Sequence, residues 1–214
     1  MLKNEGNYEG EAANQPGLTG RIGDYPEGFT EARSYPTGRL QDFQRSKVRL
    51  WSIYTFRMGR AGNTSVSGLW RLQSGEVYSL RATGQGLTAT QRALLTAYPN
   101  RPTSQTVFFG DRGSQDFLGY GLLDTSINYD IPVFRSLRPW LKFDVFNLFD
   151  NLKQIKWNIT TRQDAASPKD SLGLANGYTL GPNYGKAEAN GNFPTPIAGV
   201  VGGRTFRVAF GLRF

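Results

Sequence analysis

The chain has 214 residues, a formal net charge of +8, and neither cysteine nor histidine. Without cysteine there are no disulfides and no thiolate metal sites. Without histidine there are no Ser-His-Asp triads, zinc hydrolase centres or two-histidine iron sites within these residues. We therefore expect no catalytic residues, no cofactor-binding residues and no metal ligands, and we interpret the chain as a non-enzyme. This length corresponds to one domain or a part of one.

The basic residues are dispersed along the chain rather than clustered, so nucleic acid is not an expected partner. No run of about eighteen apolar residues occurs, which excludes a transmembrane helix. Residues 1–6 lack the apolar segment of a signal peptide. We therefore expect either a fragment that lacks its original N-terminus or a protein that is not exported.

Period-two alternation of apolar and polar residues predicts about six strands. They cover residues 2–12 (weakly), 46–58, 64–80, 119–131, 140–149 and 206–214. In the range 119–131, for example, Leu123 and Ile127 alternate with Asp124 and Asn128. In the range 140–149 the alternation is lost at Phe146, which predicts a bulge or a strand end.

The connections between these strands differ in length. Short turns cover residues 59–63 and 132–139, whereas long loops rich in glycine and proline cover residues 13–45, 81–116 and 150–200. The second long loop includes a predicted helix from Thr88 to Ala97, which Thr88 or Thr90 caps and Pro99 ends. In a meander, both short turns lie at the same end of the sheet as the C-terminus. Short turns at one end and long loops at the other are typical of bacterial outer-membrane barrels, whereas a soluble sandwich does not require this arrangement.

The last strand has one wholly apolar face. That face consists of Phe206, Val208, Phe210, Leu212 and Phe214, and these residues alternate with Arg207, Ala209, Gly211 and Arg213. A strand face of this kind needs a protein core in water, but in a membrane barrel it needs only lipid. We expect lipid to cover it.

Three segments together resemble the C-terminal barrel of a TonB-dependent outer-membrane receptor, in particular the Oar-like receptors that carry a carboxypeptidase-regulatory-like domain. The first segment is FFGDRGS at 108–114, followed by LDTSINYDIP at 123–132. The second is WLKFDVFNLFDN at 140–151, in which Asn147 to Asp150 match the Asn-Leu-Phe-Asp element of the family. The third runs from Gly203 to the terminal Phe214.

The resemblance implies an all-β fold, an antiparallel meander of about six strands that forms the C-terminal part of a transmembrane β-barrel, with long loops on one side. Residues 1–214 would be a partial barrel, without the plug domain and the TonB-binding motif. The implied function is import of a large nutrient across the bacterial outer membrane. The implied partners are outer-membrane lipid, the remainder of the receptor, TonB through the N-terminal part, and the barrel-assembly machinery, which reads the last strand as its signal.

The resemblance places a set of charged residues on the inner face of the barrel. They are Lys47, Arg49, Arg57, Arg71, Asp124, Asp130, Lys142, Asp144, Arg207 and Arg213. Two interpretations are open, a polar lumen that contacts a ligand and structural ion pairs between neighbouring strands, and we favour ion pairs. Because their strands are expected to be adjacent, we predict that Asp144 pairs with Arg207 or Arg213.

Aromatic residues give two further expectations. Trp51, Tyr54, Trp70, Trp140 and Phe214 are candidates for interfacial aromatic girdles. Candidate ligand-contacting loop residues are Phe108, Phe109, Arg112, Trp157, Tyr178 and Tyr184. The alternative for the loop aromatics is that they pack the loops against each other, which is the commoner role of such rings. Asp164, Asp170 and Glu188 do not have the spacing of a calcium-binding loop, so no calcium site is expected.

Two rival functions remain. A soluble all-β carbohydrate-binding module requires Phe206, Val208, Phe210, Leu212 and Phe214 to pack against a second sheet. An outer-membrane lipase is disfavoured because the chain lacks histidine.

Overall fold

The computed structural model describes residues 5–6, 25–41, 43–132, 137–195 and 203–213. In these residues the chain is all-β, with antiparallel sheets, as the sequence predicts. It divides into two compact units. Unit 1 comprises residues 1–44, 75–117 and 157–188, and unit 2 comprises residues 45–74, 118–156 and 189–214.

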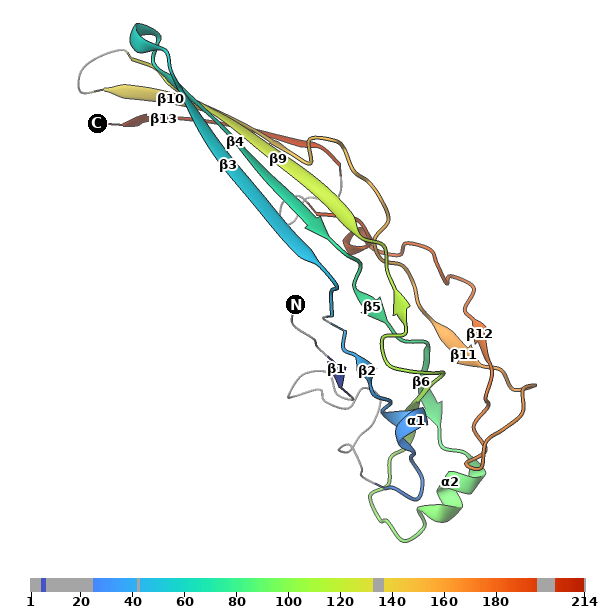
Figure 1. Cartoon of the computed structure of the whole chain (residues 1–214). Helices are drawn as coiled ribbons and strands as arrows, with labels where there is room; N and C mark the ends of the chain where they lie inside the picture. Colours follow the sequence, from blue (N-terminus) through green and yellow to red (C-terminus); the bar gives the residue numbers. More distant parts are fainter. Residues whose placement is uncertain (1–4, 7–24, 42, 133–136, 196–202, 214) are drawn as a thin grey trace. The chain divides into compact units, whose positions relative to one another are not determined.

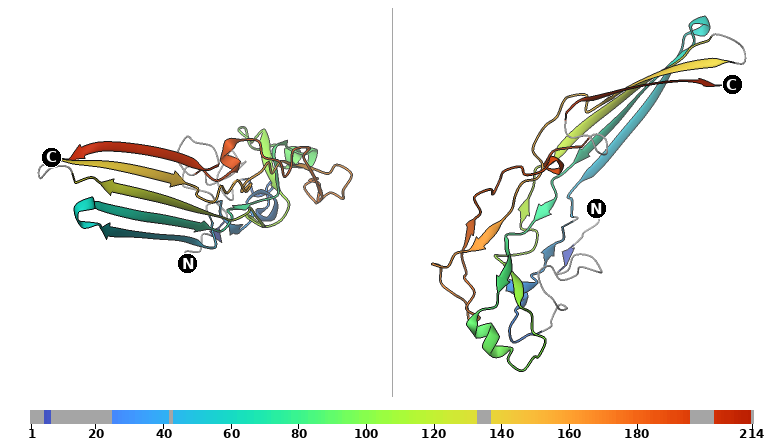
Figure 2. Two further views of the ribbon diagram at one scale, coloured as in Figure 1. Left: turned by 90° about the horizontal axis from the view of Figure 1, so that it is seen from above. Right: turned by 180° about the vertical axis from the view of Figure 1, so that it is seen from behind.

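Unit 2 contains an antiparallel sheet of long strands that lie side by side in the order β13-β10-β9-β4-β3 (Figures 1 and 2). The strands are β3 (Lys47–Arg57), β4 (Asn63–Gln73), β9 (Tyr120–Asp130), β10 (Arg138–Phe146) and β13 (Thr205–Arg213). Each long strand pairs with the next long strand along the chain, so the predicted meander is confirmed.

The ends of this sheet differ in their connections. The 3-10 turn η1 (Gly59–Ala61) joins β3 to β4, and residues 131–137 join β9 to β10. Arg213, the last residue of β13, is opposite Arg138, the first residue of β10, so β13 finishes at this same end. The connections of residues 74–119 and 147–204 leave the sheet from the other end. Short and long connections are therefore sorted as predicted.

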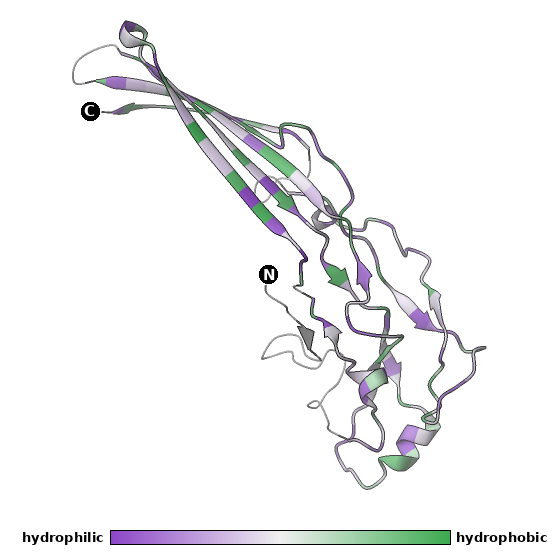
Figure 3. Ribbon diagram, viewed as in Figure 1, coloured by the Kyte–Doolittle hydropathy of each residue, from purple (hydrophilic) through white to green (hydrophobic). Residues whose placement is uncertain are grey.

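Apolar and polar residues alternate along parts of the long strands, as the green and purple bands in Figure 3 show. The pleat directs successive side chains to opposite faces of the sheet. On one face, rows such as Leu50, Trp70 and Leu123 cross the strands in register. We call this the apolar face. On the other face, rows such as Ser65 and Asn128, or Asp144 and Arg207, cross the strands. We call this the polar face.

Several strand boundaries differ from the expectation. The predicted strand 64–80 ends earlier, at Gln73. The last hydrogen bond between it and the β3 segment runs from Ser74 N–H to Ser46 O at 2.9 Å, and the ladder stops there. The predicted strand 140–149 begins at Arg138 and ends at Phe146, where the sequence predicts a bulge or a strand end, because Asn147 takes a left-handed φ of +53°. Phe214 lies outside the described residues.

The sixth predicted strand, residues 2–12, lies outside the described residues except for β1 (Glu5–Gly6). β1 pairs with β2 (Gly38–Arg39) and not with β3. The large sheet therefore has five strands in the part of the chain that the structure describes.

Unit 1 consists of short elements from three chain segments. Besides β1 and β2, they are α1 (Glu31–Ser34), β5 (Val77–Tyr78), β6 (Arg81–Gly86), α2 (Ala89–Leu94), β7 (Ser104–Phe108), β8 (Gln115–Asp116), β11 (Thr161–Gln163) and β12 (Tyr178–Leu180). The 3-10 turn η2 (Asn190–Asn192) belongs to unit 2. The predictions of plain loops at 81–116 and 150–200 are therefore wrong in detail, because these segments pair as β6 with β7 and as β11 with β12.

Two small clusters of buried side chains form the core of unit 1. One cluster is Phe29, Tyr35, Leu87 and Leu95, and the other is Val107, Leu172 and Leu174. The predicted helix is present as α2, one turn shorter at its C-terminal end than expected. Thr88 caps it, because the Thr88 hydroxyl accepts the N–H of Gln91 and the Gln91 side chain accepts the N–H of Thr88.

Candidate functional site

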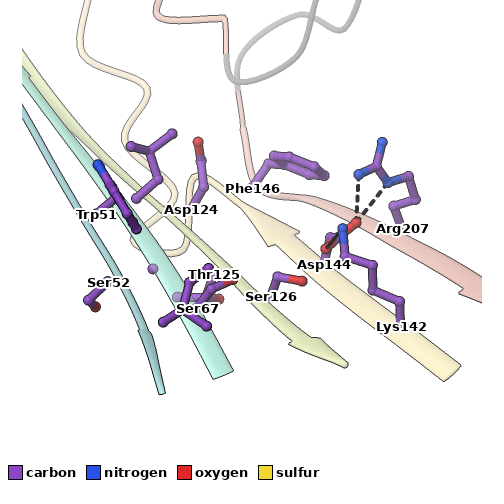
Figure 4. Close-up of a pocket in the computed structure, with 13 residues that line it drawn as sticks. Trp51, Ser52, Ser67, Asp124, Thr125, Ser126, Lys142, Asp144, Phe146 and Arg207 are labelled. Carbon is purple, nitrogen blue, oxygen red and sulfur yellow. Dashed lines mark hydrogen bonds and ion pairs between the residues drawn. The ribbon is translucent and has the colours of Figure 1, made fainter. Parts of the chain in front are cut away.

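A group of charged side chains lies on the polar face around Asp144 of β10. Arg207 of β13, directly opposite in the register, donates to Asp144 Oδ2 from Nε at 2.8 Å and from Nη2 at 2.7 Å. Lys142 lies 3.1 Å from Asp144 Oδ1 (Figure 4). Asp144 is 2% exposed, so its charge is compensated by two cations and not by water.

A second ion pair joins β4 to β9. Arg71 Nη2 donates to Asp124 Oδ2 at 2.7 Å. The other carboxylate oxygen of Asp124 accepts the backbone N–H of Asn147 at 2.9 Å. Asp124 therefore holds both the neighbouring strand and the chain reversal that ends β10.

A third ion pair joins β9 to β13. Arg213 Nη1 lies 3.1 Å from Asp130 Oδ1, and the Arg213 guanidinium lies 5.9 Å from the ring centre of Trp140. The ring of Trp140 covers Gly211, its partner across the strands. The three pairs favour the structural interpretation of the inward-facing charges.

Three of the predicted inward-facing cations, Lys47, Arg49 and Arg57, lie on the same face of β3. Among the described residues, no carboxylate lies within ion-pair distance of any of them. β3 is the edge strand of the sheet, and all its residues are exposed.

The polar face is hollowed over the middle of the sheet (Figure 4). The hollow has a volume of about 490 Å³. Its walls combine the Asp144 cluster with exposed apolar side chains. They comprise Trp51, Ser52, Ile53, Ser67, Gly68, Leu69, Asp124, Thr125, Ser126, Lys142, Asp144, Phe146 and Arg207. Hydroxyls, ions and a large ring in one concave surface suit a polar occupant that also has apolar surface.

The predicted assembly residues of β13 lie together on the apolar face. Their exposed fractions are 59% for Phe206, 62% for Val208, 84% for Phe210 and 56% for Leu212, whereas Phe214 lies outside the described residues. Exposed apolar side chains continue this face across β10, β9, β4 and β3. They include Leu141, Phe143, Ile127, Val66, Trp70, Leu72, Val48, Leu50, Tyr54 and Phe56.

The predicted girdle residues fall on both faces. Tyr54 and Trp70 lie on the apolar face, which is the face where a girdle at the membrane–water interface requires them. Trp51 and Trp140 are on the polar face, as their places in the register require, so the girdle prediction is wrong for these two. Trp51 is one residue out of phase with Leu50, and one residue reverses the direction of a side chain in a strand.

The six candidate ligand-contacting residues all belong to unit 1, and the structure gives most of them packing roles. Phe108 and Arg112 are buried, with the Arg112 guanidinium 5.1 Å from the Phe108 ring centre, so in this structure both side chains pack inside unit 1. Arg112 Nε donates to Pro36 O at 3.1 Å.

The other four candidates belong to two groups of aromatic side chains. Phe109 lies 5.3 Å from Tyr178, and Tyr178 remains exposed. Trp157 and Tyr184 meet at Tyr78, because Trp157 packs on that ring at 6.0 Å and the Tyr184 hydroxyl lies 2.8 Å from the Tyr78 hydroxyl. Tyr178 is therefore the candidate that is most available for contact with a ligand.

Sequence reasoning did not find the buried amide pair of unit 1. Gln91 of α2 and Gln105 of β7 exchange hydrogen bonds of 2.9 and 2.7 Å, and Gln91 also donates to Gly28 O at 2.8 Å. Two glutamines fourteen residues apart carry no periodic signal. Of this arrangement, only the Thr88 capping box, which positions Gln91, can be recognised in the sequence.

The acidic residues of the last long connection each have a separate structural partner. Asp170 pairs with Arg33 at 3.4 Å, Asp164 accepts the N–H of Ala166, and Glu188 accepts from Asn158. Among the residues that the structure describes, no group of three or more Asp and Glu side chains has the geometry of a metal site. Burial lowers the pKa of Arg33, and Asp170 opposes that shift.

No protein-family model, curated protein or solved structure matches this chain. The helices within the described residues are too short to cross a membrane.

Proposed function

We propose that the chain is the C-terminal sector of the β-barrel of a TonB-dependent outer-membrane receptor, which imports a large nutrient. The observation that carries the proposal is the apolar face of the five-strand meander. Large apolar side chains cover this face from β3 to β13, and Phe206, Val208, Phe210 and Leu212 of β13 are each more than half exposed. Hydrocarbon would cover such a face without a second protein layer.

The polar face supports the same proposal. It combines three inter-strand ion pairs with serine, threonine and asparagine side chains, as the water-filled or plug-filled interior of a large barrel requires. A soluble sandwich would place its apolar residues against a second sheet, and Phe210 at 84% exposure has no such cover.

The sorted connections supply the orientation. In outer-membrane barrels the short turns are periplasmic and the long connections are extracellular. The end of the sheet with η1, the β9–β10 connection and Arg213 would then be periplasmic. The connections of residues 74–119 and 147–204 would be extracellular, and exposed Tyr178 in the second of them is a candidate for contact with a nutrient.

The remaining parts of the function would lie elsewhere in the receptor. A barrel of this class has roughly 22 strands, so the rest of the receptor would complete the wall on either side of β3 and β13. TonB would supply energy through the N-terminal part, so no catalysis is assigned to this chain. The barrel-assembly machinery would read β13.

The four tryptophans make the lipid contact directly testable. Variants that keep only Trp70, on the apolar face, or only Trp51, on the polar face, are reconstituted as the full chain in phosphatidylcholine vesicles that contain brominated lipid. We expect brominated acyl chains to quench Trp70 strongly and Trp51 weakly, and aqueous acrylamide to show the reverse order. Equal quenching of the two residues by lipid would contradict the proposal.

The transport role needs the full-length gene product. We expect it in the outer-membrane fraction, and we expect a strain without the gene to lose TonB-dependent growth on one class of scarce nutrient. Siderophore iron, cobalamin, oligosaccharides and peptides would be compared as limiting sources. A freely secreted or cytosolic product would favour the soluble binding module instead.

A further inference from the structure

We propose that the open edge of β3 docks an antiparallel strand that carries carboxylate side chains opposite Lys47, Arg49 and Arg57. The proposal concerns the backbone edge and the polar face of one strand. It does not depend on lipid, and it therefore stands or falls separately from the proposed membrane function.

The backbone of β3 sets which residues face the edge. Ser74 N–H donates to Ser46 O and Met58 N–H donates to Gly62 O, each at 2.9 Å, at the two ends of the β3–β4 pair. Hydrogen-bonded pairs recur at every second residue of an antiparallel ladder. The even-numbered residues of β3 therefore direct their N–H and C=O groups to β4. The odd-numbered residues, from Lys47 to Arg57, direct theirs to the open edge.

The same odd-numbered residues carry the cations. Lys47, Arg49 and Arg57 project on the polar face, and a strand added at the edge would place a residue directly opposite each of them. Such a residue forms a hydrogen-bonded pair with the cation-bearing residue, so backbone and side-chain attraction would act at the same three positions.

The ion pairs elsewhere on this face indicate the chemistry of the partner. Each of Arg71, Arg207 and Arg213 pairs with an aspartate on another strand. The cations of β3 have no such aspartate among the described residues. Arg49 is opposite Arg71, and Arg71 is already engaged by Asp124, so the β4 side offers Arg49 only like charge. The matching carboxylates belong on the other side of β3.

The edge also lacks the usual protection against pairing. β3 is eleven residues long, contains no proline, and pairs without a register shift from Lys47 to Arg57. Edge strands that remain unpaired are commonly short, bulged or interrupted by proline. The cations would repel a second copy of the same edge, since like charges placed opposite each other are destabilising. They therefore select against β3 pairing with itself and for an acidic strand.

The spacing defines the partner strand. Its carboxylates lie opposite Arg57, then eight residues further opposite Arg49, then two residues further opposite Lys47. On its other face, apolar residues continue the rows of Leu50 and Tyr54. A strand with acidic residues at these three positions and apolar residues at the intervening alternate positions is the expected neighbour.

A cross-linking experiment tests both the edge and the charge. Because the chain contains no cysteine, Thr55→Cys places a single thiol on the polar face of β3. The full chain in detergent micelles is mixed with an eleven-residue peptide that has glutamate at the three positions and cysteine opposite residue 55. The comparison peptide has lysine at the three positions. The peptide cysteine is supplied as a mixed disulfide with thionitrobenzoate, so the thiolate at position 55 attacks the peptide sulfur and thionitrobenzoate leaves without a separate oxidant. We expect the acidic peptide to react about tenfold faster, from three favourable cross-strand pairs.

Register and charge are then changed separately. With Ile53→Cys, we expect the reactive peptide position to move by two residues. The double variant Arg49→Glu/Arg57→Glu is expected to reverse the peptide preference, whereas Arg60→Glu, which lies in the turn outside β3, leaves it unchanged. Equal reaction of both peptides, reaction without register dependence, or no reaction would overturn the proposal. So would a cross-linked dimer of the Thr55→Cys chain that the acidic peptide does not suppress.

Discussion

Asp144 and Arg207 are directly opposed on β10 and β13, and their side chains are joined by hydrogen bonds of 2.7 and 2.8 Å. The sequence predicts this pair because the two residues fall on the polar faces of strands expected to be neighbours. The alternative partner, Arg213, instead pairs with Asp130. The last strand is therefore fixed to the sheet by two ion pairs on one face while its other face remains apolar and exposed.

The first prediction exchanges these charges. Asp144→Arg or Arg207→Asp alone places like charges opposite each other at a site where Asp144 is almost fully buried. Removing one member of a fully buried ion pair costs about 3–5 kcal/mol, and the cost here is smaller because the Arg207 side chain is 56% exposed to solvent. We expect each single variant to lose much of the heat-resistant folded species in detergent. The double variant is expected to recover much of it.

The matched control for this exchange is Arg204→Asp. Arg204 precedes β13 and donates its backbone N–H to Asp150 Oδ1 at 2.7 Å, so its side chain is not part of the pair. We expect it to fold like the parent. Failure of the double variant to exceed both single variants would show that the two charges do not act as a pair.

The second prediction concerns Gly211 and the ring that covers it. A Cβ added at Gly211 would lie 2.7 Å from Cζ2 of Trp140. Gly211→Ala should therefore displace the ring and cost about 1–3 kcal/mol, measured by urea denaturation. Gly86→Ala in β6 is the control, because an added Cβ there meets nothing within 4 Å. Combining Gly211→Ala with Trp140→Ala should remove the clash, and no relief in that double variant would contradict the steric explanation.

The third prediction concerns Asp124, which accepts from the Arg71 side chain and from the Asn147 backbone. Asp124→Ala leaves both donors without this acceptor, and each hydrogen bond to a charged group contributes about 1.5–3 kcal/mol. We expect hydrogen exchange at the Asn147 amide to accelerate strongly and the unfolding midpoint in urea to fall. Ser67→Ala, on the polar face of β4, is the control and should leave exchange at Asn147 unchanged.

The long strands were predictable from the sequence because each residue faces the opposite way from its neighbour. In Leu123 to Asp130 that alternation is complete, and the structure follows it residue by residue. The same rule locates Trp51 on the polar face. The girdle prediction considered only the type of residue and ignored this phase.

Unit 1 was not predictable in the same way. Its strands are two to six residues long, too short for a periodic pattern, and its pairs join distant segments, as Thr161 of β11 does by donating to Arg81 O at 2.6 Å. The burial of Phe108 and Arg112 results from such long-range packing. Nothing in the local sequence distinguishes these two residues from exposed Tyr178.

The fourth prediction is a dependence of unit 1 on alkaline pH. Burial, and then the hydrogen bond with Tyr78, raise the pKa of Tyr184 above the value of about 10 that tyrosine has in an unfolded chain. A raised pKa means that the folded state favours the neutral phenol. The stability from this group is complete below about pH 10 and is lost progressively as the pH rises above it.

The measurement is urea denaturation between about pH 8 and pH 11, in a parent chain whose three tryptophans of unit 2 are replaced by phenylalanine. The fluorescence then comes from Trp157, which packs 5.0 Å from Phe117 and 6.0 Å from Tyr78. We expect the midpoint of the parent chain to fall at the alkaline end. Tyr184→Phe should have a lower midpoint at pH 8, since the bond to Tyr78 is lost, and a flatter alkaline slope, since the ionisable group is gone. Tyr54→Phe, at an exposed position on β3 in unit 2, is the control and should keep the parent slope. If Tyr184→Phe kept the full alkaline slope, the coupling of this hydroxyl pair to the folding of unit 1 would be refuted.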